Sequence, residues 1–214
     1  MRTYGQYCGL AKALDVIGDR WSLLIVRELM LQGPCRFTDL LHGLPGVATN
    51  LLADRLRYLE ATGVIRREAA PPPIATTLLH LTVRGEALRP VIKALGAWGG
   101  PLLAEASDDD AFRSHWLALP AEELLRDRTP NEPPMTIEVR TGDRPLIIET
   151  IDGEVRARPG TAANPDLVLS GPHRAVVRFL AGRLDLAGAQ ARGLTIDGDL
   201  DAIRRLQPEA AALG

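Results

Sequence analysis

The spacing of apolar residues changes between the two halves of the chain. Through the first half they recur every three to four positions, which predicts amphipathic helices. The expected helices are 9–17, 20–31, 37–41, 47–62 and 82–98, and strands at 64–68 and 78–81 precede the last of them. Helices followed by a two-stranded hairpin and a trailing helix are the elements of a winged helix-turn-helix.

Polar and helix-breaking residues set the expected boundaries. Asp19 and Thr82 are candidate N-caps for the helices that follow them. The loop AAPPPIATT at 69–77 is not expected to continue the hairpin ladder, because proline has no amide donor.

Apolar residues alternate with polar ones in the second half, which predicts strands. Alternation covers 135–139 and 146–150, and Asp152-Gly153 is a strong hairpin signal after it. Further strands are expected at 166–170 and 194–196, with helices at 111–126, 172–181 and 197–206. The fold class is therefore α+β, a winged helix-turn-helix domain followed by a smaller domain with an antiparallel sheet and helices. The expected parts are 1–105 (winged domain), 106–134 (helix and proline-rich linker) and 135–214 (second domain).

Helix 47–62 has two different faces at about 100° per residue. One face is a core stripe, made of Leu51, Leu52, Leu56 and Leu59. The other carries small or hydrogen-bonding residues, which are Thr49, Asn50, Ala53 and Arg57. An ordinary solvated face is the alternative to a groove-binding face. The tight LPG turn before this helix and the basic hairpin after it favour the groove, with Arg66 and Arg67 near the DNA backbone or minor groove.

Arg55 projects from the middle of the apolar stripe, where a guanidinium is not expected to reach DNA. A buried charge is costly without a partner, so a structural ion pair is expected, with Glu28 or Asp39 as the acid.

Composition restricts the function classes. The 214 residues carry a net charge of −2, divided into +4 for residues 1–103 and −6 for 104–214. No apolar run approaches the roughly 20 residues of a membrane span, and no signal sequence is recognisable, so a cytoplasmic protein without a membrane partner is expected. Two cysteines and four scattered histidines predict no metal site and no cofactor. Without a catalytic motif, an enzyme is not expected.

Residues 8–100 resemble the HxlR-type winged helix-turn-helix regulators of bacteria. The motifs that carry the resemblance are CGLAKALDVIGDRWSLLIVRELM, RFTDLL, NLLADRLRYLEATGVIRR and LTVRGEALRPVIKALGAWG. The resemblance implies a homodimer formed by the first and last helices of the domain, and DNA recognition by Thr49, Asn50 and Arg57. It also makes Cys8 a candidate redox sensor, for which a small interface residue is the alternative. Cys35, beside Arg36, is a weaker redox candidate.

Residues 130–206 resemble the sterol carrier protein fold. The carrying segment is PDLVLSGPHRAVVRFLAGRLDLAGAQARGLTIDGDLDAIRRL. Such domains enclose an apolar tunnel for lipids or acyl chains, and the expected lining here is Ile148, Leu167, Leu169, Val176, Phe179 and Leu180. A filled core without a ligand remains the alternative.

The sequence thus predicts a transcriptional regulator that binds double-stranded DNA as a homodimer and whose second domain senses an apolar small molecule or lipid. The competing hypothesis is a lipid or acyl carrier whose helical half only dimerises.

Overall fold

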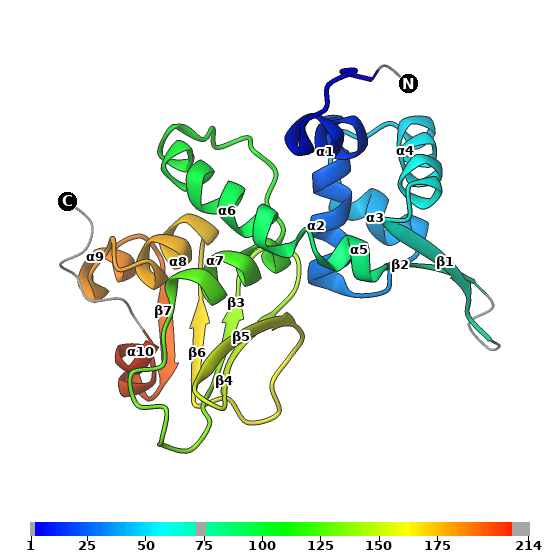
Figure 1. Ribbon diagram of the computed structural model, residues 1–214. Coiled ribbons are helices and arrows are strands. Elements are labelled where there is room, and N and C mark those ends of the chain that lie inside the picture. Colours follow the sequence, from blue (N-terminus) through cyan, green and yellow to red (C-terminus); the bar gives the residue numbers. More distant parts are fainter. Residues whose placement is uncertain (1–2, 72–75, 207–214) are drawn as a thin grey trace. The chain divides into compact units, whose positions relative to one another are not determined.

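The computed structural model describes residues 3–71 and 76–206 (Figure 1). The chain divides into two compact units between Trp98 and Gly99, earlier than the predicted end of the first domain at 105. Among the described residues, no helix combines the length and the apolarity that a membrane crossing requires.

The first unit contains six helices and a hairpin among its described residues. Their bounds are α1 (Gly9–Ile17), α2 (Ser22–Gln32), α3 (Phe37–Gly43), α4 (Thr49–Ala61), β1 (Ile65–Ala69), β2 (Thr77–Leu81), α5 (Val83–Glu86) and α6 (Arg89–Gly99). The prediction of one continuous helix over 82–98 is wrong, because Ala87 and Leu88 separate α5 from α6. Pro90 explains the break: it lacks an amide hydrogen and is tolerated only in the first turn of a helix.

The two predicted N-caps of this unit behave differently. Thr82 caps α5, since its hydroxyl accepts a hydrogen bond from the Gly85 amide at 3.1 Å. Asp19 does not cap α2, whose N-cap is Trp21 and has no side-chain bond. The Asp19 carboxylate is instead in an ion pair with Arg55.

The hairpin is longer than predicted and has a third partner. Ala69 pairs with Thr77, so the expectation that the ladder stops before residue 69 is wrong; the rest of that loop, 72–75, lies outside the described residues. Cys35 forms an isolated antiparallel bridge with Leu79, which ties the base of the hairpin to the segment between α2 and α3.

The second unit combines a five-stranded sheet with helices (Figure 1). Its elements are the short 3₁₀ helices η1 (Gly100–Glu105) and η2 (Ser114–Leu117), then α7 (Ala118–Leu124), β3 (Thr136–Arg140), β4 (Leu146–Ile151), β5 (Glu154–Pro159), β6 (Leu167–Ser170), α8 (His173–Leu180), α9 (Leu186–Gln190), β7 (Thr195–Gly198) and α10 (Leu200–Leu206). The predicted Asp152-Gly153 hairpin is confirmed between β4 and β5, and both turn residues have the positive φ that a two-residue turn requires, 51° and 77°. The predicted helix over 111–126 is shorter and is preceded by η2.

The sheet has the order β5-β4-β3-β6-β7 and is mixed. The prediction of an antiparallel sheet is wrong at one pair, because β6 runs parallel to β3. The chain leaves β5 and must return to the opposite end of the sheet to enter β6, so residues 160–166 cross the face of β4 and β3. Glu138 of β3 holds this crossover: it is 1% exposed and accepts a hydrogen bond from the Ala162 amide at 2.7 Å.

Residues 106–134, predicted as a linker, are bonded to the rest of the second unit. The Arg126 amide donates to the Leu206 carbonyl and the Arg128 amide to the Arg205 carbonyl, at 3.2 and 3.1 Å. The Arg174 guanidinium donates to the carbonyl of Ala106 at 2.9 Å. This segment therefore packs as part of the second unit.

Candidate nucleic-acid interface

Helix α4 is anchored by one face and leaves the other outward. Leu52, Leu56 and Leu59 are each 0% exposed, as the core stripe predicted. Leu51 is 37% exposed, so its assignment to the core is wrong. It lies at the margin of the stripe and in the first turn of the helix, where no other element covers it.

The outward face of α4 presents the predicted polar residues. Thr49, Asn50 and Arg57 are exposed, and Ala53 is half-buried. In the described part of the chain, the side chains of Thr49 and Asn50 make no hydrogen bond. They are therefore available to an external ligand.

The N-terminus of α4 carries no side-chain cap. Its N-cap residue is Ala48, which has no side-chain acceptor. The first amides of a helix have no acceptor within the helix, and together with the helix dipole they favour an anion at this end. A tight turn with Gly46 at φ 84° leads into the helix from α3, which brings its uncapped end to the surface.

Each predicted arginine contacts a carboxylate of its own unit. Arg57 is in an ion pair with Asp54, one turn earlier on α4, and Arg66 with Glu68 on β1. The Nε of Arg67 donates to Glu60 of α4 at 2.9 Å. These acids were missed as partners from the sequence, although the i, i+3 spacing of Asp54 and Arg57 is a recognisable signal.

The two wing arginines lie on opposite faces of the hairpin. Arg66 pairs across the strands with His80, while Arg67 pairs with the buried Leu79. Arg67 thus lies on the side that packs on the unit, where it reaches Glu60 and links the hairpin to α4. Arg66 lies on the other side.

Arg55 has the structural role that its position predicted, but with another partner. It pairs with Asp19, and not with Glu28 or Asp39. Glu28 is fully buried and accepts hydrogen bonds from Arg27 and Gln32. Asp39 accepts from the Arg36 amide at 2.9 Å. Sequence spacing could not identify Asp19, which lies in the loop between α1 and α2.

The two cysteines differ in access. Cys8 is exposed and is the N-cap residue of α1. Cys35 is 2% exposed, and its thiol donates to the Gly33 carbonyl at 3.0 Å. A redox role for Cys8 stays a prediction, and burial makes Cys35 the weaker candidate of the two.

The predicted tunnel residues of the second unit are buried. Ile148 and Leu167 both pair with Ile137 and so lie on one face of the sheet, in line with the pair of Leu169 and Val139. The six residues are between 0 and 6% exposed: Ile148, Leu167, Leu169, Val176, Phe179 and Leu180. None of them lines the polar pocket beside α10 or the cavity beside α1 that are described below.

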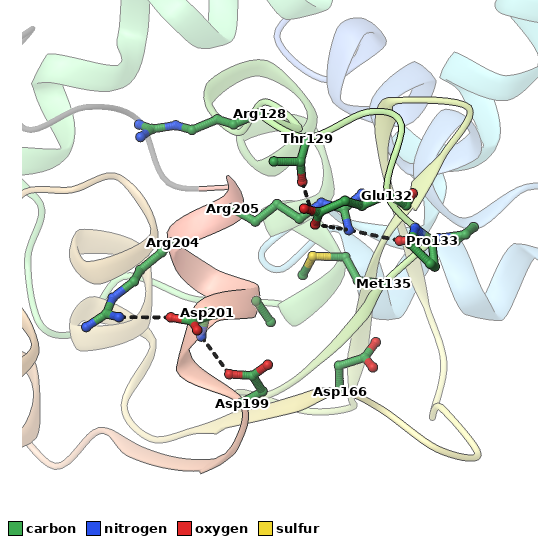
Figure 2. Close-up of a pocket in the computed structure, with 12 residues that line it drawn as sticks. Arg128, Thr129, Glu132, Pro133, Met135, Asp166, Asp199, Asp201, Arg204 and Arg205 are labelled. Atoms are coloured by element: carbon green, nitrogen blue, oxygen red, sulfur yellow. Dashed lines mark hydrogen bonds and ion pairs between the residues drawn. The ribbon is translucent and has the colours of Figure 1, made fainter.

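A polar pocket of about 550 Å³ lies between α10 and residues 128–135 (Figure 2). Most of its charged groups contact one another. Asp201 pairs with Arg204, the Asp201 amide donates to Asp199, and Arg205 contacts Glu132. Arg205 also makes two hydrogen bonds with Asp127, at 2.7 and 2.8 Å, and these hold the pKa of the Asp127 carboxyl below its usual range.

The sequence did not reveal this pocket. The contacts of Arg205 with Asp127 and Glu132 join α10 to the segment before β3. In the residues that the structure describes, no cluster of three or more His, Cys, Asp or Glu side chains is placed to hold a metal ion.

Comparison with known proteins gives the context of the first unit. The family model for the HxlR-like helix-turn-helix matches residues 16–107. An uncharacterized HTH-type transcriptional regulator of Synechocystis sp. is 36% identical over 103 residues, which cover 48% of this chain and 76% of that protein. The HTH-type transcriptional regulator YodB of Bacillus subtilis is 33% identical over 89 residues, 42% of this chain and 79% of YodB. The structure of the reduced form of YodB matches 48% of this chain and 100% of its own, at 29% identity and a TM-score of 0.41.

The matched residues include α3, α4 and the hairpin. The relatives are transcriptional regulators and not enzymes, and this family membership confirms the prediction that the protein is not an enzyme. The chain belongs to the HxlR-like helix-turn-helix family of transcriptional regulators.

Proposed function

We propose that this regulator binds double-stranded operator DNA, with α4 in the major groove and the β1–β2 wing beside the DNA backbone. The observation that carries the proposal is the outward face of α4, where Thr49 and Asn50 are exposed at an uncapped helix N-terminus. Asparagine can make two hydrogen bonds to an adenine edge, and uncapped amides suit a phosphate. Arg57 of α4 and Arg66 of the wing would contact phosphates once these displace Asp54 and Glu68.

The proposal includes a homodimer formed through α1 and α6. Two apolar rows on these helices are exposed: Leu10 (69%) and Leu14 (39%) on α1, and Val91 (41%), Leu95 (48%) and Trp98 (75%) on α6. Each row follows helical spacing, and exposed apolar side chains grouped on one helix face are typical of protein interfaces. A two-fold assembly would place two α4 helices on half-sites about 34–36 Å apart.

For the second unit we propose a sterol-carrier-like fold. The order of β6, α8, β7 and α10 supports it, since a strand and a helix are followed, after the short α9, by a further strand and the last helix. Of the two alternatives for its interior, the complete burial of Leu167 and Val176 favours a filled core and not a lipid tunnel. A ligand between the sheet and the helices would have to displace that packing. Native mass spectrometry of the purified protein tests this: co-purified lipid would overturn the filled core.

Asn50→Ala tests the DNA proposal. Duplexes selected from a random pool by the full-length protein are compared with scrambled duplexes, by fluorescence anisotropy at several salt concentrations. Wild-type affinity should fall steeply with salt, and Asn50→Ala should lose about 1–3 kcal/mol of discrimination. Asn131→Ala, which changes an exposed asparagine of the second unit, should leave it unchanged.

Failure to select any duplex would refute DNA binding. If lipid were recovered at the same time, the competing carrier hypothesis would replace it. If a duplex were selected but Asn50→Ala kept full discrimination, base reading would have to be assigned to another residue of α4.

A further inference from the structure

A second cavity lies entirely within the first unit, between α1, α5 and the residue that joins α4 to β1. Its volume is about 340 Å³. The apolar part of its lining is formed mainly by Val16 and Ile17 of α1, Val64 and Leu88. Apolar cavities of this size with a few polar groups at the edge are typical small-molecule sites.

The charged residues that line this cavity are both cations, Lys12 and Arg84. Within the described part of the chain, Arg84 makes no ion pair and no hydrogen bond. Lys12 lies 3.8 Å from Asp15, whose carboxylate already accepts hydrogen bonds from the Thr3 hydroxyl and the Tyr4 amide. Among the described residues no acid lines the cavity, so its edge has a net positive charge.

We propose that this cavity binds an organic anion, an aromatic or short aliphatic carboxylate. Its apolar body would lie on Val16, Ile17, Val64 and Leu88, and its carboxylate would meet the guanidinium of Arg84 and the ammonium of Lys12. Arginine suits this role because its planar group donates two parallel hydrogen bonds to a carboxylate.

The position of Val64 connects this site with the proposed DNA surface. The Val64 amide donates to Leu59 of α4 at 2.8 Å, and its carbonyl accepts from the Thr82 amide at 3.1 Å. Val64 is therefore the joint between α4 and the wing. On the opposite side of the cavity is α1, which Tyr58 of α4 contacts through a hydrogen bond from its hydroxyl to the Asp15 carbonyl at 2.8 Å.

A bound anion would thus contact both the α4–wing joint and the helix of the proposed dimer interface. Resting on the proposed function, this placement makes the anion an effector of DNA binding. A ligand that prefers one spacing of α1 and α4 changes DNA affinity, and DNA changes ligand affinity by the same factor.

The test uses 2-naphthoate as the probe and 2-naphthamide as its uncharged match, titrated into the full-length protein by calorimetry. Naphthoate should bind at least about tenfold more tightly than the amide, because only the anion forms charge-assisted hydrogen bonds. Arg84→Gln should lose most of that difference. Arg183→Gln, which removes an exposed arginine from the second unit, should not. Ala13→Phe, which fills the cavity from α1, should abolish binding of both probes.

Equal binding of the two probes, no binding by the wild-type protein, or full binding by Arg84→Gln would each overturn the anion site. The regulatory part is measured separately, by DNA anisotropy with and without saturating naphthoate. A shift in DNA affinity of about threefold or more, absent in Arg84→Gln, supports it, and an unchanged affinity overturns it. If naphthoate binds through Arg84 but no duplex is bound, the proposed function fails while the anion site stands.

Discussion

At the scale of single residues, the arginines of α4 and the wing already have carboxylate partners. Arg57, Arg66 and Arg67 each contact a carboxylate of the same unit. These ion pairs are largely exposed to solvent, and such pairs contribute only about 0–1 kcal/mol. A phosphate can therefore replace the carboxylate at small cost, but the exchange lowers the net gain from each DNA contact.

Removing one of these acids should strengthen DNA binding. We expect Glu68→Gln, which releases Arg66, to tighten binding to any duplex by about twofold to fivefold, because the phosphate then no longer has to displace an exposed carboxylate. Anisotropy titrations of selected and scrambled duplexes measure the change. The matched control is Glu154→Gln, which releases Arg156 of the second unit from a similar exposed pair and should leave DNA affinity unaltered. Weaker binding by Glu68→Gln would mean that Arg66 needs its acid to keep its position on the wing.

The sequence identified outward residues better than it identified their partners. The exposure of Thr49, Asn50 and Arg57 follows from helical spacing alone. The ion pair of Arg55 with Asp19 depends on how the loop before α2 folds against α4, which spacing does not contain. Leu51 was misplaced for a similar reason: periodicity gives the direction of a side chain, and not whether another element covers it.

At the scale of secondary-structure elements, α4 begins without a cap. An N-cap serine, threonine or aspartate would stabilise a helix start by about 1 kcal/mol relative to alanine. The alanine at position 48 leaves the first amides of α4 to water or to a ligand. The start of the helix is thus less stable than a capped one, and its first amides lack a side-chain acceptor.

Ala48→Ser should separate these two properties. We expect the substitution to raise the free energy of unfolding by roughly 0.5–2 kcal/mol and to weaken DNA binding, because the serine hydroxyl would occupy amides that a phosphate would otherwise use. Chemical denaturation and anisotropy provide the two readouts. The comparison is Cys8→Ser under reducing conditions, since Cys8 is an uncapped, extended N-cap of α1. That variant should gain stability without loss of DNA affinity. A gain in both properties for Ala48→Ser would exclude a phosphate at this helix end.

The strands were located from the sequence, but the pairing of β6 was not. Alternation at 166–170 predicts a strand, and it carries no information about the direction of its neighbour. The parallel pair of β3 and β6 requires the crossover 160–166, and Glu138, which holds this crossover, occupies an ordinary polar position in the alternation of β3, so it gave no signal in the sequence. A carboxylate at that position is stable only where amide and guanidinium donors reach it.

Glu138 should make the second unit sensitive to acid. The hydrogen bond from Arg140 is the main cause that holds the pKa of Glu138 below its usual range, against the opposing effect of burial. A lowered pKa in the folded state means that the carboxylate stabilises the fold fully above the unfolded pKa, near about 4.3, and that this contribution is lost as pH falls through the folded value. Glu138→Gln should therefore cost about 1–3 kcal/mol at neutral pH and flatten the pH dependence below about pH 5.

Thermal denaturation followed by calorimetry, in steps of about one unit from roughly pH 3 to roughly pH 7, measures this effect. Glu154→Gln, which changes an exposed glutamate of β5 in the same sheet, should leave the pH profile as it is in the wild type. An identical profile for Glu138→Gln would remove Glu138 as the acid-sensitive group.

At the scale of the whole molecule, the charge division seen in the sequence corresponds roughly to the two units. The order of the elements was enough to predict the winged helix-turn-helix architecture, and the family comparison supports it for residues 16–107. The acidic run at 107–110, which marks the change in composition, follows the division of the two compact units at Trp98 and Gly99.

The exposed apolar rows of α1 and α6 make the proposed homodimer testable. We expect Trp98→Glu to shift the protein from dimer to monomer in sedimentation velocity, because a charge would be buried at the interface. It should weaken operator binding through the loss of the second α4. Ile151→Glu changes a side chain of the second unit that is 47% exposed and should leave the sedimentation coefficient unaltered. A monomeric wild type would refute the homodimer.

The bonds from residues 106–128 to Arg174, Arg205 and Leu206 have a practical meaning for chimeric regulators. Consider a chimera in which a foreign sensor domain is fused after the proline-rich stretch 129–134. It would keep residues 106–128 but lose the second-unit residues to which they are hydrogen-bonded. The fusion should be made at Gly99 instead, because each compact unit then keeps its own internal contacts.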